Sequence, residues 1–563
     1  MRRIRADRRT MAAAVVYGIL LCAAMLTGGQ MEREGYLHPP TAEETVRLVL
    51  MLVLSIGLTA LCWTELSRLL LRREGTAKRT GKPGMERAAF LILTAVDFVV
   101  LLGVYPGFFV YDASEELSMV QSRLFTTHHP LVHVLLLGGI IQAVHRVTGS
   151  YNAGIFLYSI LQAAAVNAAL TLVLKRVWDK SGTLPARLGF LFLLLCPTVS
   201  MFTLCTAKDG LFSACLVLQC LLLSELQGDA GAFLQSRRKT AGLILAAAGM
   251  MLLRKNGAYA YAVCLILYGI AALSRVLRVR KKHREGALPS GKCALRLAAV
   301  LLLPVLLFAA TDRTLAAALH ARPDGSQEIL TVPIQMLART YVSDPGSFSE
   351  EELVLMRGLM SDEDWNRYNP ALSDQVKLRF NSEVFRENRQ AYIALFFRQG
   401  KAHPVTYLNA WLGTSYGFFA PDAVVDCYRG NQVFTFTYGD SSYFGYETEL
   451  PGVRHSMIPA VDAWYRFLSL SPVPQRIPVL HWFYTPGGIF FLWLFLAGFL
   501  VSAGRGKRLL PFAPVLCVWL TVLAGPCTLP RYVVYLWFGF PLALGTALEP
   551  AERNEIWRTE PDG

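Results

Sequence analysis

The chain has 563 residues, of which 53% are hydrophobic and 17% are charged, and its mean hydropathy is +0.38. An ordinary soluble domain carries about 25% charged residues, so a water-soluble protein of this size is excluded. The formal charge of +14 would suggest nucleic-acid binding in a soluble chain, but here Lys and Arg cluster in short segments between apolar runs. Such segments report membrane orientation. We therefore expect an all-α polytopic membrane protein whose partner is the lipid bilayer, with no nucleic acid.

Apolar runs long enough to cross a bilayer recur along the whole chain. The first run follows five arginines, and its length of about 19 residues favours a membrane anchor over a cleaved signal peptide. We expect twelve transmembrane helices, near residues 11–29, 46–70, 88–105, 152–174, 188–206, 210–226, 241–254, 258–275, 294–311, 484–503, 510–526 and 532–548.

Basic segments between these runs test the topology. They lie at residues 72–87, 175–187, 237–239, 275–284 and 505–508. With twelve spans, every one of them falls on the same side as the N-terminus. The positive-inside rule then predicts a multi-pass protein of the cell inner (plasma) membrane, with both termini cytoplasmic.

The apolar stretch at 131–144 is an exception to this pattern. Counting it as a span would put the basic segment 175–187 outside and invert every later loop. The stretch is also short for a membrane crossing, and His133 interrupts it. We interpret it as an outer juxtamembrane helix that does not cross the bilayer.

The spans divide the chain into three parts. Residues 1–311 form an N-terminal membrane domain that contains the first outer loop, 106–147, where we expect catalysis. Residues 312–482 are polar, rich in Asp, Glu, Arg, Tyr and Pro, and long enough for one large outer loop domain. Residues 483–563 hold the last spans and a short cytoplasmic tail.

The first outer loop, YPGFFVYDASEELSMVQSRLFTTHHP, carries the first candidate acids, Asp112, Glu115 and Glu116. Asp112 follows an apolar stretch that ends in Tyr111, a setting that raises the pKa of a carboxyl toward that of a general base. Tyr111 is a candidate substrate contact. The alternative is that these acids are solvated residues at the start of a helix.

The same loop ends in His128, His129 and Pro130. We interpret His129 as a candidate catalytic residue and His128 as a candidate substrate contact. The alternative is a hydrogen-bonded pair at the membrane interface. Adjacent histidines point in different directions, which argues against a metal site built on both. We therefore predict no metal-binding residues.

Two further junctions combine charges with tight turns. CTAKDGLF brings Lys208 and Asp209 to a break between spans, where Asp209 is a candidate acid and an ordinary polar turn is the alternative. RKNGAY brings Arg254, Lys255 and Asn256 to the outer side, where the positive-inside rule disfavours cations. A lipid phosphate at the outer leaflet would explain these cations, with Asn256 as a substrate contact.

Two later motifs complete the set of outer cations. VPIQMLART places Gln335 and Arg339 one helical turn apart, and LPRYVVYLWF places Arg531 at the outer end of the last span. We expect Lys208, Arg254, Lys255, Arg339 and Arg531 to form a cationic pocket for the phosphate of a donor, and Gln335 to contact substrate.

Together these features resemble the GT-C superfamily of polyprenyl-phosphate-sugar-dependent glycosyltransferases. The segments YPGFFVYD, TAKDGLF, RKNGAY and PIQMLAR look like those of a bacterial multi-span family, domain of unknown function 6020, over most of residues 90–540. The GT-C resemblance implies that Asp112 activates the acceptor and that His129 and Pro130 match the motif after it. The chain departs from the pattern in its second acid, which is Glu115 or Glu116, and in lacking a second Pro after the histidines.

The sequence hypothesis is therefore a GT-C-like glycosyltransferase that moves a sugar from a polyprenyl-phosphate donor to an envelope acceptor. A transporter or flippase of lipid-linked saccharide would use the same cations without a base, and a non-catalytic scaffold for envelope assembly is a further alternative. The absence of an inverted repeat and the position of the polar groups on one face weigh against the transporter. The residues indicate no cofactor, and a divalent cation stays open.

Overall fold

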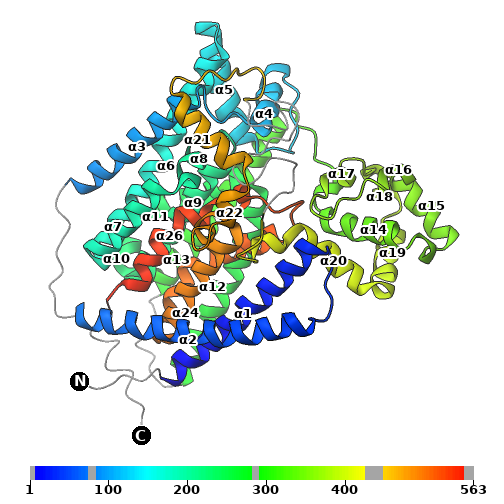
Figure 1. The fold of residues 1–563 in the computed structure, drawn as a ribbon. Helices are drawn as coiled ribbons and strands as arrows, with labels where there is room; N and C mark the ends of the chain where they lie inside the picture. The colour runs from blue at the N-terminus through cyan, green and yellow to red at the C-terminus, as the bar shows by residue number, and fades with distance from the viewer. Residues whose placement is uncertain (1–6, 74–83, 282–290, 425–447, 551–563) are drawn as a thin grey trace.

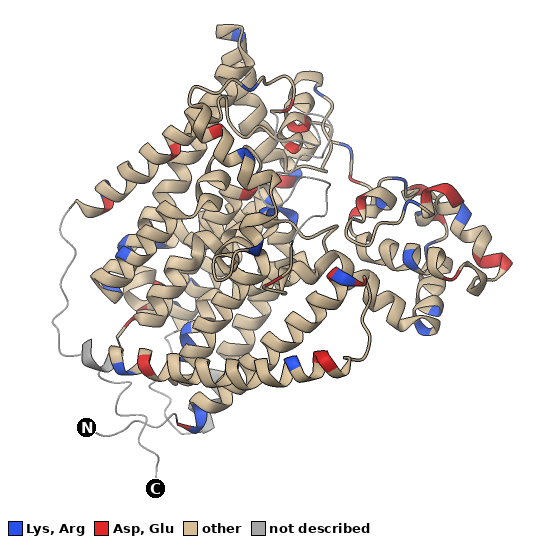
Figure 2. Ribbon diagram, in the orientation of Figure 1, with Lys and Arg blue, Asp and Glu red and all other residues tan. Residues whose placement is uncertain are grey.

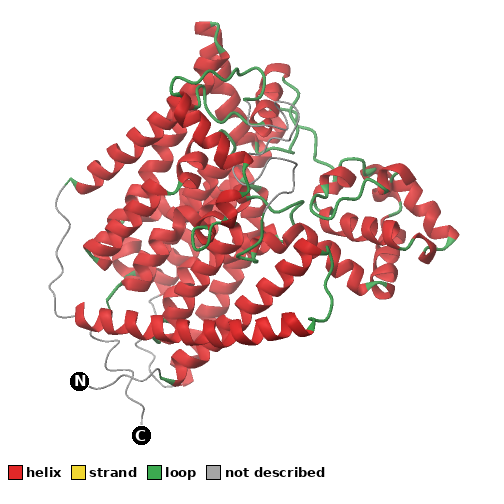
Figure 3. Ribbon diagram, viewed as in Figure 1, coloured by secondary structure: helices red, strands yellow, loops and turns green. Residues whose placement is uncertain are grey.

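The computed structural model describes residues 7–73, 84–281, 291–424 and 448–550. Within these ranges the chain consists of helices joined by loops, with three isolated β-bridges and no strand (Figure 3). Parts of the predicted basic segments 72–87 and 275–284, and the predicted tail from residue 551, lie outside the described residues. The expected all-α fold class is confirmed for the part that the structure describes.

Eight described helices are long and apolar enough to cross a membrane. A ninth span results if α7 (Thr183–Leu195) and α8 (Pro197–Leu204), which are bent by 64° at their break, count as one. The eight are α1 (Arg8–Arg33), α2 (Ala42–Arg73), α5 (Leu131–Thr148), α6 (Tyr151–Ser181), α9 (Asp209–Gly228), α12 (Lys255–Lys281), α13 (Gly291–Ala318) and α26 (Val534–Leu548) with the turn before it.

Four expected spans form helices that miss these criteria, so the count of twelve is not confirmed. The reason differs among them: α3 (Met85–Gly103) contains Glu86, Arg87 and Asp97, whereas the others are short. The short ones are α11 (Arg237–Leu253), α24 (Pro486–Ser502) and α25 (Ala513–Val522). Asp97 is buried and accepts a hydrogen bond from Asn167 on α6 (2.7 Å), which compensates its burial between the two helices.

Helix α5 is long and apolar enough to cross a membrane, although the sequence predicts that it lies outside the bilayer. It runs antiparallel to the first turns of α6: His133 bonds to Tyr158 (2.9 Å), and His145 stacks on Tyr151 with 3.7 Å between ring centroids. At 31 residues, roughly 46 Å, α6 is longer than the hydrocarbon core, so its first turns can extend beyond it alongside α5. The non-crossing α5 stays a prediction.

Two of the predicted basic segments, 175–187 and 505–508, meet at one end of the helix bundle, here called the basic end. Arg176 forms an ion pair with Glu549 (3.4 Å), and Arg505 donates to the backbone carbonyl of Glu549 (2.8 Å). A guanidinium nitrogen of Arg9 approaches Gly504. The chain near the N-terminus therefore lies at the same end as two of the basic loops, as the positive-inside argument requires.

Two helices run from the basic end to the opposite end, here called the site end. Helix α9 starts at Asp209, and near its other end Gln227 donates to the carbonyl of Lys507 at the basic end (2.8 Å). Residues Pro530–Leu548 make the same passage in 19 residues. Each corresponds to roughly 30 Å, the thickness of a hydrocarbon core.

The region expected as one loop domain divides into two parts. Residues 331–407 form a small helical unit beside the bundle, with a core of its own around the fully buried Trp365 (Figure 1). Charged residues are frequent in this unit, whereas most of the bundle carries few (Figure 2). Its helices are α14 (Thr331–Ser343), α15 (Glu350–Leu359), α16 (Asp362–Trp365), α17 (Asp374–Lys377), α18 (Ser382–Glu387) and α19 (Arg389–Ala402).

The rest of the predicted loop returns to the bundle. Phe418, Tyr465 and Leu468 belong to the main hydrophobic core, because large apolar side chains there find helices to pack on. Helix α13 also runs to Ala318, past the predicted boundary. The helices of this part are α20 (Pro404–Ser415), α21 (Pro459–Leu470), α22 (Val473–Arg476) and α23 (His481–Tyr484).

Candidate functional site

The first motif, YPGFFVYD, forms a turn that only glycine fits. Gly107 has φ +142°, and a Cβ there would lie 2.7 Å from the Ser159 hydroxyl. The carbonyl of Phe108 then accepts a hydrogen bond from the Thr206 backbone N–H (3.1 Å), which ties this turn to the one before α9. The chain enters α4 (Tyr111–Ser122) with Asp112 in its first turn, where the helix dipole favours a carboxylate.

The second motif, AKDGLF, forms the start of α9. Lys208 precedes the helix and Asp209 opens it. A Cβ at Gly210 would lie 2.4 Å from the carbonyl oxygen of Phe202, so the close approach of α8 and α9 requires glycine. The side-chain amide of Gln162 donates to the carbonyl of Thr203 (3.0 Å) and holds the same turn from α6.

The remaining cations come from two other breaks. Arg254 is the extended residue between α11 and α12, and its guanidinium lies 5.6 Å from the ring centroid of Phe212 and 5.1 Å from that of Tyr532. Arg531 belongs to the short 3-10 helix Pro530–Val533 that leads into α26. Breaks between helices at the site end thus supply the cations Lys208, Arg254 and Arg531.

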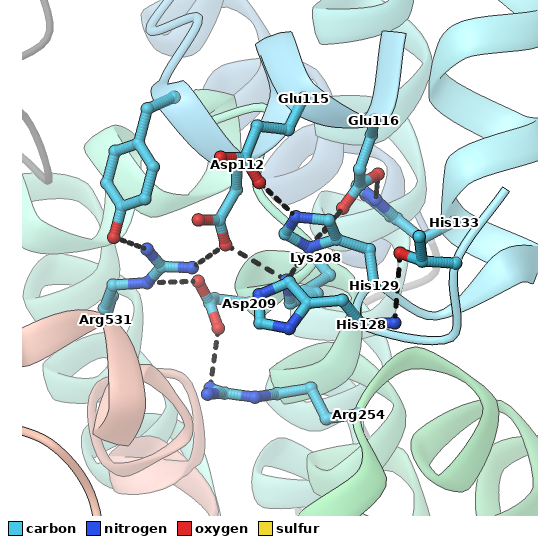
Figure 4. Close-up of polar contacts among 12 residues, drawn as sticks. Asp112, Glu115, Glu116, His128, His129, His133, Lys208, Asp209, Arg254 and Arg531 are labelled. Carbon is cyan, nitrogen blue, oxygen red and sulfur yellow. Dashed lines mark hydrogen bonds and ion pairs between the residues drawn. The ribbon is translucent and has the colours of Figure 1, made fainter. Parts of the chain in front are cut away.

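Arg531 links the carboxylates of Asp112 and Asp209 in the assembled cluster (Figure 4). Its side chain is 3% exposed, and it donates to Asp112 Oδ2 (2.5 Å) and Asp209 Oδ2 (3.0 Å). It also donates to the Tyr111 hydroxyl (3.3 Å). Arg254 donates to the other oxygen of Asp209 (2.6 Å). Two acids and two cations therefore alternate from α4 to the α11–α12 break.

Lys208 extends this chain of contacts toward the histidines. Its ammonium group donates to Asp112 Oδ2 and to His129 Nδ1, both at 3.0 Å, and lies 3.9 Å from Glu116 Oε1. His129 is buried, and its Nε2 lies 2.9 Å from Glu115 Oε2. The sequence-predicted acids and His129 therefore share one network (Figure 4).

Sequence reasoning did not assign a role to His133 or Tyr158. Both are buried, with His133 Nδ1 2.5 Å from Glu116 Oε2 and the Tyr158 hydroxyl bonded to His133 Nε2. The signal was an ionisable side chain on an apolar helix, which needs a buried partner. Glu116 is the partner, and it is fully buried.

The electrostatics of Asp112 differ from the expectation. Burial by itself raises the pKa of this carboxyl, but the charges of Arg531 and Lys208 outweigh it and hold the pKa well below the ordinary value. Burial likewise raises the pKa of Glu116, and the charges of His133 and Lys208 lower it overall. The prediction of a raised Asp112 pKa is wrong, because cations surround the carboxylate that the sequence placed among apolar neighbours.

Two predicted residues lie at the edge of the cluster. Lys255 is half-exposed and bonds to Asp324 Oδ2 (3.1 Å), and His128 Nδ1 lies 3.3 Å from Asp324 Oδ1. Asp324 was not singled out by the sequence. It follows α13 and brings the start of the predicted loop domain against the first outer loop.

Three predicted residues bond elsewhere. Arg339 donates to the carbonyl of Gly35 (2.8 Å), and so links α14 to the end of α1. Gln335 donates to the carbonyl of Asn369 (2.6 Å), and Asn256 donates to the Thr521 hydroxyl (3.0 Å). Helical spacing correctly predicted a shared face for Gln335 and Arg339, but it does not determine what that face contacts.

The expected cationic pocket is not what the described residues form. Each cation near the cluster is in contact with a carboxylate: Lys208 and Arg531 with Asp112, Arg254 with Asp209, and Lys255 with Asp324. With Glu115 and Glu116 added, the carboxylates outnumber the cations. Buried charges require such pairing, so isolated cations on this face would have been costly.

Glu115, His128 and His129 form a further group. One ligand atom from each lies within 4.8 Å of the others, as in a metal-binding triad. The rings of His128 and His129 are close, with centroids 4.7 Å apart and planes at 79°. Adjacent position in the chain therefore does not separate the two rings as the sequence argument assumed.

The comparisons with known proteins give one result. The model of the family of unknown function DUF6020 matches residues 110–558. The chain belongs to this family. The match confirms the family resemblance and contains the motifs TAKDGLF, RKNGAY and PIQMLAR and the cluster residues from Asp112 to Arg531, whereas α1 to α3 precede it. No curated protein and no solved structure matches the chain.

Proposed function

We propose that this DUF6020 protein is a GT-C-type integral-membrane glycosyltransferase, which transfers a sugar from a polyprenyl-phosphate donor to an acceptor of the cell envelope. The observation that carries the proposal is the position of the acid–base cluster at the site end, one hydrocarbon thickness from the basic end. A polyprenyl phosphate keeps its chain in the bilayer and its phosphate at the surface. A cluster at the site end would therefore meet such a phosphate.

In the proposed reaction, the acceptor hydroxyl oxygen forms a bond to the anomeric carbon of the sugar. The bond from that carbon to the phosphate oxygen breaks, and its electron pair leaves with the polyprenyl phosphate. The hydroxyl proton must pass to a base within hydrogen-bond reach. Asp112 is the proposed base, because both of its cation contacts are to Oδ2, and Oδ1 receives no hydrogen bond from the described residues.

The low pKa of Asp112 is compatible with this role. Ionisation at neutral pH is required of a base, and the surrounding cations maintain it. A weak base suffices when the transition state resembles an oxocarbenium ion, because the hydroxyl becomes acidic as its oxygen bonds to carbon. We therefore assign the proton transfer to a late stage of bond formation.

Arg254 is the proposed contact for the leaving phosphate. A guanidinium has five N–H donors, and Arg254 uses one of them on Asp209 among the described residues. Its side chain is 13% exposed, so a ligand oxygen can reach it. Lys255 beside it is half-exposed and adds charge. Arg531 instead holds Asp112 and Asp209 in place, since its contacts with both are buried.

The test is a turnover measurement on Asp112→Asn, with the protein in lipid nanodiscs and polyprenyl-phosphate sugars as donors. Loss of a general base should lower turnover by about 10²–10⁴-fold while donor binding and expression persist. Asp179→Asn is the matched control, because Asp179 is exposed and pairs with Lys175. Mass spectrometry of a deletion strain should find accumulated lipid-phosphate monosaccharide.

Two results would contradict the proposal. Movement of intact lipid-linked saccharide across vesicles, without consumption of the donor, would favour the transporter or flippase. Binding of envelope proteins with neither activity would favour the scaffold. Near-normal transfer by Asp112→Asn would instead exclude Asp112 as the base and direct attention to Glu115, Glu116 or Asp209.

A further inference from the structure

Glu115, His128 and His129 bring a carboxylate and two imidazoles together beside the proposed reaction centre. His129 Nε2 and Glu115 Oε2 are 2.9 Å apart, and one ligand atom from each of the three residues lies within 4.8 Å of the others. Two histidines and one carboxylate are the protein ligands of many open zinc sites. We propose that these three side chains bind a divalent transition-metal ion, with zinc as the ion that suits the donor set. The role that we assign to the metal rests on the proposed glycosyltransferase function.

The second nitrogen of His128 supports this assignment. His128 Nδ1 faces Asp324 Oδ1, which leaves Nε2 for a metal and forms the carboxylate–histidine pair that commonly orients a metal ligand. His129 Nδ1 faces Lys208 and lies 3.7 Å from Glu116 Oε1, while its Nε2 faces Glu115. Both rings are thus fixed by their Nδ1 atoms.

Glu116 supplies an independent observation. This residue is fully buried, and its Oε1 has no hydrogen-bond partner among the described residues. When a metal binds Nε2 of a neutral imidazole, Nδ1 must carry the proton and needs an acceptor. A small movement of the His129 ring toward Glu116 would let Nδ1 donate to Glu116 Oε1. Lys208 would keep its contact with Asp112. The unpaired oxygen is therefore where a metal-bound His129 would need it.

The charge balance gives the metal a role. Because carboxylates outnumber cations around the cluster, the described residues alone attract an anionic donor weakly. A divalent ion would reverse this balance, and three protein ligands leave a coordination position for a phosphate oxygen of the donor. The ligand class at that position is a phosphate ester.

The test is zinc binding by the purified full-length protein, measured by equilibrium dialysis with elemental analysis. We expect one zinc per chain, and Mg²⁺ should not compete, since it prefers oxygen ligands. His128→Ala and Glu115→Gln should weaken zinc binding by more than about 100-fold, and Asp324→Asn by about 10–100-fold. His455→Ala and Glu351→Gln are the controls, because both side chains are exposed and outside the cluster.

The outcomes separate this inference from the proposed function. No stoichiometric zinc, or equal binding by His128→Ala and His455→Ala with matched melting temperatures, would overturn the metal site. Transfer that continues unchanged after a chelator has removed the zinc would refute the role of the metal, while the glycosyltransferase assignment stands. Zinc bound through these residues in a protein without transfer activity would uphold the site and remove the proposed function.

Discussion

Replacing Arg531 by Met tests the cluster without reference to any activity. The Arg531 side chain is 3% exposed and donates to Asp112, Asp209 and the Tyr111 hydroxyl. In Arg531→Met both carboxylates lose their shared cation. Lys208 still contacts Asp112, and Arg254 still contacts Asp209, so neither carboxylate is left without a charge partner.

The expected cost follows from this arrangement. Removing one partner of a buried ion pair costs about 3–5 kcal/mol, and the remaining cations place the loss at the lower limit, about 3 kcal/mol. Arg531→Lys keeps the charge but lacks the planar fork that reaches two carboxylates, so about 1–2 kcal/mol should be lost. Asp209→Asn and Arg531→Met combined should cost about 1 kcal/mol less than the sum of the two single losses, because the two side chains contact each other.

The free energy of unfolding can be measured by titrating SDS into mixed micelles while following tryptophan fluorescence. Arg379→Met is the matched control, because Arg379 is exposed on the helical unit beside the bundle, and it should change stability by less than about 0.5 kcal/mol. A loss below about 1 kcal/mol in Arg531→Met, or additive losses in the double variant, would refute the buried bridging role.

Three further results are expected. Arg254→Gln should lower donor affinity about tenfold through loss of one charge-assisted contact, measured by lipid-phosphate titration, while Arg339→Gln leaves that affinity unchanged. Gly210→Ala should destabilise the protein by about 1–3 kcal/mol in the same SDS titration, because its Cβ would meet the Phe202 carbonyl. A reporter inserted after Gly325 and one fused after the last residue should lie on opposite sides of the membrane, and reporters on one side would contradict the two-ended arrangement.

The local sequence pattern of glycines and charged residues predicted the breaks between helices well. The motifs around Gly107 and Gly210 form turns that exclude a Cβ, and Lys208, Asp209 and Arg254 lie at the ends of apolar helices. These features depend on neighbouring residues in the chain. The number of membrane spans was harder to predict. Hydropathy alone cannot tell whether short helices such as α24 and α25 are spans, or whether α5 crosses the bilayer.

The partners of the site residues could not be predicted in the same way. Arg531 and Asp112 are 419 positions apart, and their contact depends on how α26 packs beside α9. Arg339 satisfied the same local criteria as Arg531, yet it bonds to Gly35. The raised pKa expected for Asp112 was wrong for this reason: its sequence neighbours are apolar, while its spatial neighbours are cations.

The sequence by itself determined the helical membrane class, the family motifs and the charged breaks, because hydropathy, charge asymmetry and turn chemistry act over a few residues. Only the tertiary structure decided which charges meet. It paired Asp112 and Asp209 through Arg531, and it brought Glu115 to the histidines. Burial makes an unpaired charge costly, so each ionisable group requires a partner, but helix packing across hundreds of residues selects that partner.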